Sequence, residues 1–348
     1  MRMSKYAPSG LNTSATEFSV NDGCETMAGV FSIVVIMFFL AACNEGETVY
    51  PEAISTAQIL RPVMIVAHRG GSAYAPENTV TAFKNGLRLE ADVLELDVQV
   101  TGNEIIVLHD STLERTTNCS TLSSDADAAV REVCDAGYKW RPSGSVSVAG
   151  RRPASFRGKG ITIPLLSDVL GSVSDSSIRL MIELKFTNDD GSRSTLDHAV
   201  DTLINHLREE TIDSRLWINS SDGYPLSRIE AVWPEVETIL TWDSTGSASC
   251  EGSVLDAISR GFDGISIQAP RSNPLRLAPC AQMARDAGLW VMFWDVNRVS
   301  DVEELLPLSP DALISDYPAC LSALLRNVRF DDPYADGVSL GPYYAKCG

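Results

Sequence analysis

Eight short apolar runs, separated by longer segments with helical patterning, constrain the fold of this chain more than any other feature. The runs lie at 63–67, 93–100, 179–185, 216–220, 236–242, 264–268, 289–294 and 312–315. Continuous apolar runs are typical of strands that are buried on both faces of a parallel sheet. Eight strand–helix units in this length predict an α/β fold, the (β/α)8 TIM barrel. An open doubly wound sheet is the alternative, but no glycine-rich nucleotide loop follows the first run.

Two acidic residues within the second run predict a metal site. Glu95 and Asp97 are two apart, so their side chains share one face of the strand. Carboxylates on one face repel each other unless a positive group lies between them, and hard oxygen ligands favour one divalent cation, Ca²⁺ or Mg²⁺. Surface acids on an edge strand are the alternative. The valines and leucines around the pair indicate a doubly buried strand and favour the cation.

Two histidines follow apolar runs and predict acid–base chemistry. His68 comes directly after the first run, and His109 comes after an additional apolar run at 105–108. Because the C-terminal ends of barrel strands meet at one rim, we expect both rings near the carboxylates. Imidazole titrates near neutral pH, so one ring can accept a proton while the other donates one. A lone histidine at such a place is usually a packing or capping residue, but the combination favours catalysis.

The third run repeats the pattern of an acid, a leucine and a charged residue. Glu183 and Lys185 are two apart and face the same way, which supplies another oxygen ligand and a cation for phosphate. A structural salt bridge between them is the alternative. With the upstream residues, the pair favours a metal-assisted phosphate-ester site.

The order of these motifs resembles that of the glycerophosphodiester phosphodiesterase family. The resemblance covers most of residues 63–326 and rests on HRG at 68–70, PENT at 76–79, ELDV at 95–98, VLHDSTLERTT at 107–117, IPLL at 163–166, IELK at 182–185, FWDVN at 293–297 and ISDYP at 314–318. It implies that a divalent metal is bound by three acidic residues, Glu95, Asp97 and Glu183. It also implies that His68 and His109 act as general acid and base, in an order that the residues leave open.

The same resemblance implies substrate-binding positions. Arg69 and Lys185 match family positions that hold the phosphate. Glu77 and Asn78 match positions that line the metal and phosphate end. Trp294 matches an aromatic residue near the substrate in some relatives, and the alternative of a core tryptophan in an apolar strand stays open.

The activity that the resemblance implies is hydrolysis of glycerophosphodiesters to glycerol 3-phosphate and an alcohol. A lysophospholipase D that acts on lysophospholipids is the nearest alternative, and a non-catalytic lipoprotein scaffold is a less favoured one because every proposed ligand and histidine is present. The formal net charge of −18 argues against a nucleic acid partner, since a polyanion would be repelled over most of the surface.

Residues 113–160 interrupt the strand–helix alternation and resemble the small insertion that the family carries after its second strand. Their latter half, 141–160, contains basic residues and no acid, so it would attract anionic substrates or lipid headgroups. A solvated loop is the favoured alternative. Residues 195–210 predict an amphipathic helix whose His198 and His206 match no motif, and we expect both to be structural or exposed.

The N-terminal region predicts export and a lipid anchor. Residues 29–42 form an apolar run of signal-peptide length, too short for a comfortable membrane span. The run ends in Leu-Ala-Ala-Cys, which resembles the lipobox of bacterial lipoproteins, so we expect a signal peptide at 1–43 and a lipidated Cys43 on a membrane-anchored periplasmic or cell-surface protein. An uncleaved anchor is the alternative. The remaining parts are a linker at 44–62, a phosphodiesterase domain at 63–330 and a tail at 331–348.

Six cysteines follow Cys43, an even number that predicts disulfides in an oxidising compartment. None has the close paired spacing of a zinc site. Proximity in the sequence favours three pairs, Cys119 with Cys134, Cys250 with Cys280, and Cys320 with Cys347.

Overall fold

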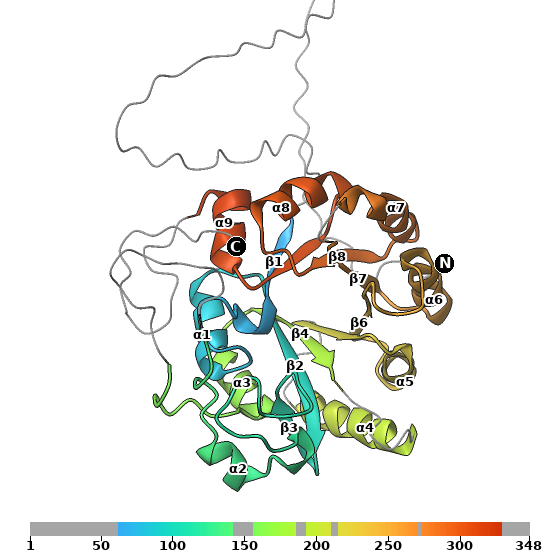
Figure 1. The fold of residues 1–348 in the computed structure, drawn as a ribbon. Coiled ribbons are helices and arrows are strands. Elements are labelled where there is room, and N and C mark those ends of the chain that lie inside the picture. The colour runs from blue at the N-terminus through green and yellow to red at the C-terminus, as the bar shows by residue number, and fades with distance from the viewer. Residues whose placement is uncertain (1–61, 142–155, 186–192, 210–214, 271–272, 329–348) are drawn as a thin grey trace, which may run out of the picture. The chain divides into compact units, whose positions relative to one another are not determined.

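The computed structural model describes residues 62–141, 156–185, 193–209, 215–270 and 273–328 (Figure 1). The predicted signal peptide with Cys43, the linker up to residue 61 and the tail from residue 331 lie outside these ranges. Most of the predicted basic half of the insertion does too, because 142–155 are not described. Within the described ranges, every helix is too short or too polar to cross a bilayer.

Eight parallel strands form a closed barrel. They are β1 (Met64–Ala67), β2 (Val93–Thr101), β4 (Arg179–Leu184), β5 (Leu216–Ser220), β6 (Glu237–Trp242), β7 (Gly264–Gln268), β8 (Trp290–Trp294) and β9 (Ala312–Ser315). Neighbouring strands pair in chain order, and β1 pairs with both β2 and β9, so the sheet closes on itself. The predicted TIM barrel is confirmed, with its strands on the eight predicted apolar runs.

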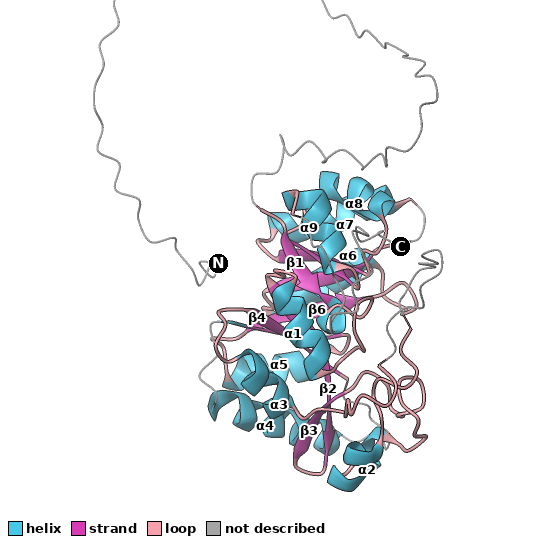
Figure 2. Cartoon of the chain, turned by 90° about the vertical axis from the view of Figure 1, so that its left-hand side faces the viewer, coloured by secondary structure: helices cyan, strands magenta, loops and turns pink. Residues whose placement is uncertain are grey.

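One helix follows each barrel strand and packs on the outside of the barrel (Figures 1 and 2). These helices are α1 (Val80–Arg88), α3 (Leu166–Val173), α4 (Arg193–Glu209), α5 (Gly223–Val232), α6 (Cys250–Arg260), α7 (Ala278–Asp286), α8 (Val299–Leu305) and α9 (Pro318–Arg326). The predicted amphipathic helix at 195–210 is α4. His198 and His206 are exposed on it, as expected.

Alternation along the strands decides which side chains face the barrel interior. Leu94 and Leu96 of β2 pack in the large core between the strands and the helices. Val93 packs in a smaller core inside the barrel, with side chains from strands around the whole circle. Because alternate residues share a face, Glu95 and Asp97 also point inward.

The strand β3 (Glu104–Val107) pairs antiparallel with the end of β2 and lies outside the barrel circle. Gly102, with a φ of 58°, occupies the turn between the two strands, a conformation that glycine adopts without steric cost. Since β3 runs back along β2, the amide of Leu108 donates to the carbonyl of Asp97 at 3.0 Å. The pairing thereby delivers His109 to the mouth of the barrel.

The segment between β3 and α3 is the predicted insertion after the second strand. It carries α2 (Ala128–Val133), which lies beside β3 in both views (Figures 1 and 2). Disulfides join Cys119 to Cys134 within this segment and Cys250 to Cys280 between α6 and α7, so both predicted pairs are confirmed. Disulfides are typical of proteins that fold in an oxidising compartment. Cys347, of the third predicted pair, lies outside the described residues.

Candidate active site

Three acidic side chains converge at the C-terminal end of the barrel. Glu95 and Asp97 come from β2, and Glu183 comes from β4, where it pairs in register with Asp97. Each residue offers one carboxylate oxygen, and these three oxygens all lie within 4.8 Å of one another. Glu95 is 2% exposed and Asp97 is 0% exposed. The three residues predicted as metal ligands are therefore brought together.

The chemistry of this acidic cluster fits a divalent cation. Oε1 of Glu95 and Oδ1 of Asp97 are buried and accept no hydrogen bond from the described residues, which is costly for carboxylate oxygens away from water. Burial and the charge of Asp97 raise the pKa of Glu95 to about 8. Burial also disfavours the charged form of Asp97, but Arg69 and Lys185 hold its pKa below the ordinary value. A hard cation would use both free oxygens as ligands.

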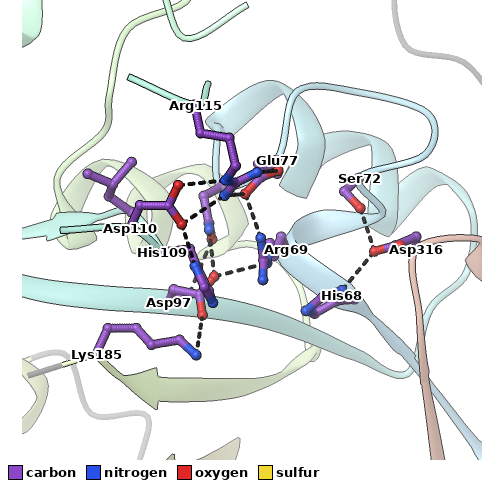
Figure 3. Close-up of polar contacts among 12 residues, drawn as sticks. His68, Arg69, Ser72, Glu77, Asp97, His109, Asp110, Arg115, Lys185 and Asp316 are labelled. Carbon is purple, nitrogen blue, oxygen red and sulfur yellow. Dashed lines mark hydrogen bonds and ion pairs between the residues drawn. The ribbon is translucent and has the colours of Figure 1, made fainter. Parts of the chain in front are cut away.

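His68 lies beside Asp316 (Figure 3), and it also faces Asp295 and Glu95 of the acidic cluster. Its Nδ1 is 2.7 Å from Oδ1 of Asp316 and 3.4 Å from Oδ1 of Asp295, while its Nε2 is 4.0 Å from Oε2 of Glu95. Burial disfavours the charged ring, but Asp295 and Asp316 raise the pKa of His68 to about 10. The His68 ring is therefore protonated on both nitrogens at neutral pH, and its Nε2 faces the acidic cluster.

The turn after β1 brings a backbone amide into contact with the acidic cluster. Arg69 has a φ of 51° and Gly70 a φ of 82°, both in the left-handed region. A Cβ at Gly70 would lie 2.8 Å from the backbone of Ala82 in α1, so only glycine fits this close approach. The amide of Arg69 consequently donates to Oε2 of Glu95 at 2.7 Å.

His109 lies near the acidic cluster and has its own carboxylate partner, Asp110 (Figure 3). Its Nδ1 is 2.6 Å from Oδ1 of Asp110, and Arg115 donates through Nε to the other oxygen of Asp110 at 2.5 Å. Burial lowers the pKa of His109, and the charges of Arg69 and Lys185 act in the same direction. The ring is therefore neutral at neutral pH.

Both residues predicted to hold phosphate adjoin the acidic cluster. Nε of Arg69 is 3.2 Å from Oδ2 of Asp97. Nζ of Lys185 pairs with Glu183 and lies 3.6 Å from Oδ1 of Asp97. Arg69 and Lys185 thus form ion pairs with side chains that would also bind the metal.

The remaining predicted site residues, Glu77, Asn78 and Trp294, have different contacts. Glu77 accepts from Arg69 at 2.7 Å and also from Arg115. The side chain of Asn78 forms two hydrogen bonds with Asp97. Its Nδ2 donates to Oδ2 of Asp97 at 2.7 Å, and its Oδ1 accepts from the backbone amide of Asp97 at 3.2 Å. Asn78 therefore orients a proposed metal ligand. Trp294 is half-buried at the end of β8 and lines the cavity of the site.

Two adjoining cavities open at this end of the barrel. The smaller, of about 100 Å³, is lined by both motif histidines, by Glu95 and Glu183 of the acidic cluster, and by Trp294. The larger, of about 360 Å³, shares His68, Arg69 and Asp295 with it. A small molecule can therefore contact His68 from either cavity.

The sequence model of the glycerophosphoryl diester phosphodiesterase family matches residues 68–320. This chain belongs to that family. The match begins at His68 and includes the acidic cluster, both histidines and the insertion. The chain is thus an enzyme of the phosphodiesterase class, and the resemblance of its motifs is confirmed over most of the barrel.

Relatives agree with this assignment along almost their whole length. A glycerophosphodiester phosphodiesterase from Caldanaerobacter subterraneus is 27% identical over 268 residues, which is 76% of this chain and 98% of the relative. One from Bacillus altitudinis is 32% identical over 258 residues, 73% of this chain and 94% of the relative. The structure of an Oleispira antarctica phosphodiesterase in complex with the product sn-glycerol-3-phosphate matches with a TM-score of 0.61 and 22% identity, covering 76% of this chain and 96% of that one.

Several residues of the phosphodiesterase site were not predicted from the sequence. They are Asp110, Arg115, Asp295, Asn297 and Asp316, and all lie inside the quoted motifs. A positional signal exists for two of them, because Asp295 directly follows β8 and Asp316 directly follows β9, at the barrel rim where polar side chains converge. Asp316 is itself held by Ser72 and Asn297.

Proposed function

We propose that this phosphodiesterase hydrolyses glycerophosphodiesters to glycerol 3-phosphate and an alcohol, with one divalent cation held by Glu95, Asp97 and Glu183. The observation that carries the proposal is the convergence of the three carboxylates beside one cavity that both His68 and His109 line. The relatives' names support the substrate class, and the product bound to the Oleispira antarctica enzyme supports glycerol 3-phosphate as the retained half.

A Ca²⁺ or Mg²⁺ ion at the acidic cluster would polarise a non-bridging oxygen of the phosphodiester. Arg69 and Lys185 add positive charge beside the cluster, where negative charge on the phosphoryl group increases during the reaction. Glu77 and Asn78 hold Arg69 and Asp97 in place through the hydrogen bonds described above. Trp294 lines the smaller cavity, where it would contact the glycerol half.

His68 is the proton donor in this proposal, and His109 is the proton acceptor. Asp316 and Asp295 keep His68 protonated through its Nδ1 side, which leaves Nε2 to protonate the departing alcohol oxygen. His109 is neutral and removes the proton of the attacking oxygen, while Asp110 orients its ring.

The experiment that tests this function follows glycerol 3-phosphate release from glycerophosphoglycerol and glycerophosphocholine. We expect turnover that EDTA abolishes and that added Ca²⁺ or Mg²⁺ restores. Asp97→Asn should lose this restoration, and the surface variant Asp256→Asn should keep it. Full turnover in EDTA would contradict the cation's role, and no turnover of either diester would contradict the substrate class. Faster turnover of lysophosphatidylcholine than of both diesters would make lysophospholipids the substrates.

We also propose that the chain is exported and lipidated at Cys43. The lipobox-like sequence supports lipidation, and the two disulfides of the described residues support folding outside the cytoplasm. Metabolic labelling with radioactive palmitate should mark the full chain and leave a Cys43→Ser variant unlabelled. Equal labelling of both proteins would contradict the anchor.

A further inference from the structure

The larger cavity has walls from two different parts of the chain. One wall comes from the barrel loops around His68. The other comes from the insertion between β3 and α3, which contributes three cations and a tryptophan, Arg115, Lys139, Arg141 and Trp140. The volume of about 360 Å³ suits a small alcohol with a substituent. The proposed proton donor His68 lines this cavity as well as the smaller one, so the departing alcohol can occupy it.

Trp140 fixes the insertion wall to the barrel. Its indole Nε1 donates to the carbonyl of Ser72 at 2.9 Å, in the loop that follows β1. Its ring packs edge-to-face against Phe156, with the centroids 4.9 Å apart. The two residues on either side of it, Lys139 and Arg141, also line the cavity.

The carboxylates of this cavity already have cationic partners. Both oxygens of Glu77 accept from Arg115, at 2.7 and 2.8 Å. Oδ1 of Asp316 and Oδ1 of Asp295 lie 2.7 and 3.4 Å from Nδ1 of His68. Each carboxylate that lines the cavity therefore lies beside a basic side chain.

Two of the cations have no such partner among the residues that the structure describes. Lys139 donates to the backbone carbonyl of Glu114, and neither Lys139 nor Arg141 forms an ion pair with any carboxylate of the described residues. Both side chains are exposed at the cavity. The cavity therefore has excess positive charge on the insertion side.

Building on the proposed function, we propose that Lys139 and Arg141 make this cavity a subsite for a leaving alcohol that carries an anionic group, such as a second phosphate. A cation next to a phosphate forms a charge-assisted hydrogen bond, which favours such diesters over neutral ones. The same charges repel a quaternary ammonium such as choline.

The aromatic content of the cavity agrees with this selectivity. A quaternary ammonium is bound by the faces of several aromatic rings. Within the described lining, Trp140 is the single tryptophan, with no tyrosine or phenylalanine beside it, and its ring already packs on Phe156. The cavity thus has the charge for an anion and lacks the aromatic cage for choline.

The test compares kcat/KM for three diesters that share the glycerophosphoryl half. They are glycerophosphocholine, glycerophosphoglycerol and glycerophosphoinositol 4-phosphate, whose alcohols are cationic, neutral and anionic. We expect the anionic diester to exceed the choline diester by roughly tenfold, and the ratio to decrease at high salt. A choline diester turned over as fast as the anionic one would overturn the proposal.

The double variant Lys139→Gln/Arg141→Gln should lower the anionic-to-neutral ratio of kcat/KM by about tenfold. The matched control is Lys84→Gln/Lys159→Gln, which removes the same charge from a different cavity and should keep the ratio. An unchanged ratio in the first variant, or an equal decrease in the second, would overturn the subsite. Absence of turnover of all three diesters by the unmodified protein would instead overturn the proposed function, and the subsite with it.

Discussion

The protonation of Glu95 links cation binding to pH. Its pKa is raised to about 8, first by burial and then by the charge of Asp97, so the metal-free carboxyl holds a proton at pH 7. A carboxylate must lose that proton to bind a cation. The acidic cluster should therefore bind its ion more tightly as the pH rises towards 8.

We predict that Ca²⁺ or Mg²⁺ binding at pH 7 releases about one proton per cation. Calorimetric titration in buffers with different ionisation enthalpies measures this number. Glu95→Gln should bind more weakly and release no proton from this position. Identical binding enthalpies in all buffers for the unmodified protein would contradict the prediction.

Asp316 controls the proton on His68, and its removal should change the pH dependence of the reaction. Asp316 faces Nδ1 at 2.7 Å and contributes to raising the pKa of His68 to about 10. A proton donor is active below its pKa, so we predict that Asp316→Asn moves the alkaline limb of kcat/KM to lower pH by roughly one unit. Asp256→Asn, on the surface of α6, should leave the limb in place. An unmoved limb in Asp316→Asn would contradict the role.

At the residue scale, the sequence predicted the groups whose neighbours are set by local geometry. Glu95 and Asp97 are two apart on one strand, so their shared face follows from strand alternation alone. The partners of His68 could not be predicted in this way, because Asp316 is 248 residues away and reaches Nδ1 only when β9 closes the barrel against β1.

At the scale of the elements, the apolar runs predicted all eight barrel strands. The run at 105–108 was also recognised as apolar, but four residues do not specify a pairing partner or direction. Its antiparallel pairing with β2 depends on the turn at Gly102 and on packing of the insertion against the barrel. That pairing, rather than the strand itself, places His109 at the site.

The opposite ends of the strands hold a polar cluster with a structural role. Both oxygens of Glu237, at the start of β6, accept from the indole N–H groups of Trp217 and Trp290, at 2.7 and 3.0 Å. Arg179 pairs with Glu237 at 2.7 Å and lies over the ring of Trp217. Residues at the N-terminal end of a TIM barrel typically serve stability.

Glu237→Ala would leave these donors without an acceptor at a largely buried position. We predict a decrease of about 2–4 kcal/mol in the free energy of unfolding, measured by urea denaturation. Glu237→Gln keeps one acceptor and should lose less. Because the cluster is at the far end of the strands, kcat of the folded variants should remain within about twofold of the parent. A large loss of kcat without loss of stability would contradict this division.

At the scale of the whole molecule, an acidic chain places several basic side chains at its candidate active site. The formal net charge is −18, yet Arg69, Lys185 and the insertion cations gather around the barrel mouth. Together with a bound divalent cation, these basic side chains would offset the carboxylates where a phosphodiester binds, while the acidic surface repels polyanions. One barrel end thus serves catalysis and the other serves stability.

The central claim is that His68 donates a proton to the departing alcohol and that His109 accepts one from the attacking oxygen. Changing the leaving group tests this claim most directly. The measurement compares kcat of His68→Gln and His109→Gln on glycerophosphoglycerol and on the p-nitrophenyl ester of glycerol 3-phosphate, since nitrophenolate leaves without a proton. We predict that His68→Gln loses at least about 100-fold on the first substrate and little on the second, while His109→Gln loses on both. Equal losses of His68→Gln on both substrates, or no loss on either, would contradict the account.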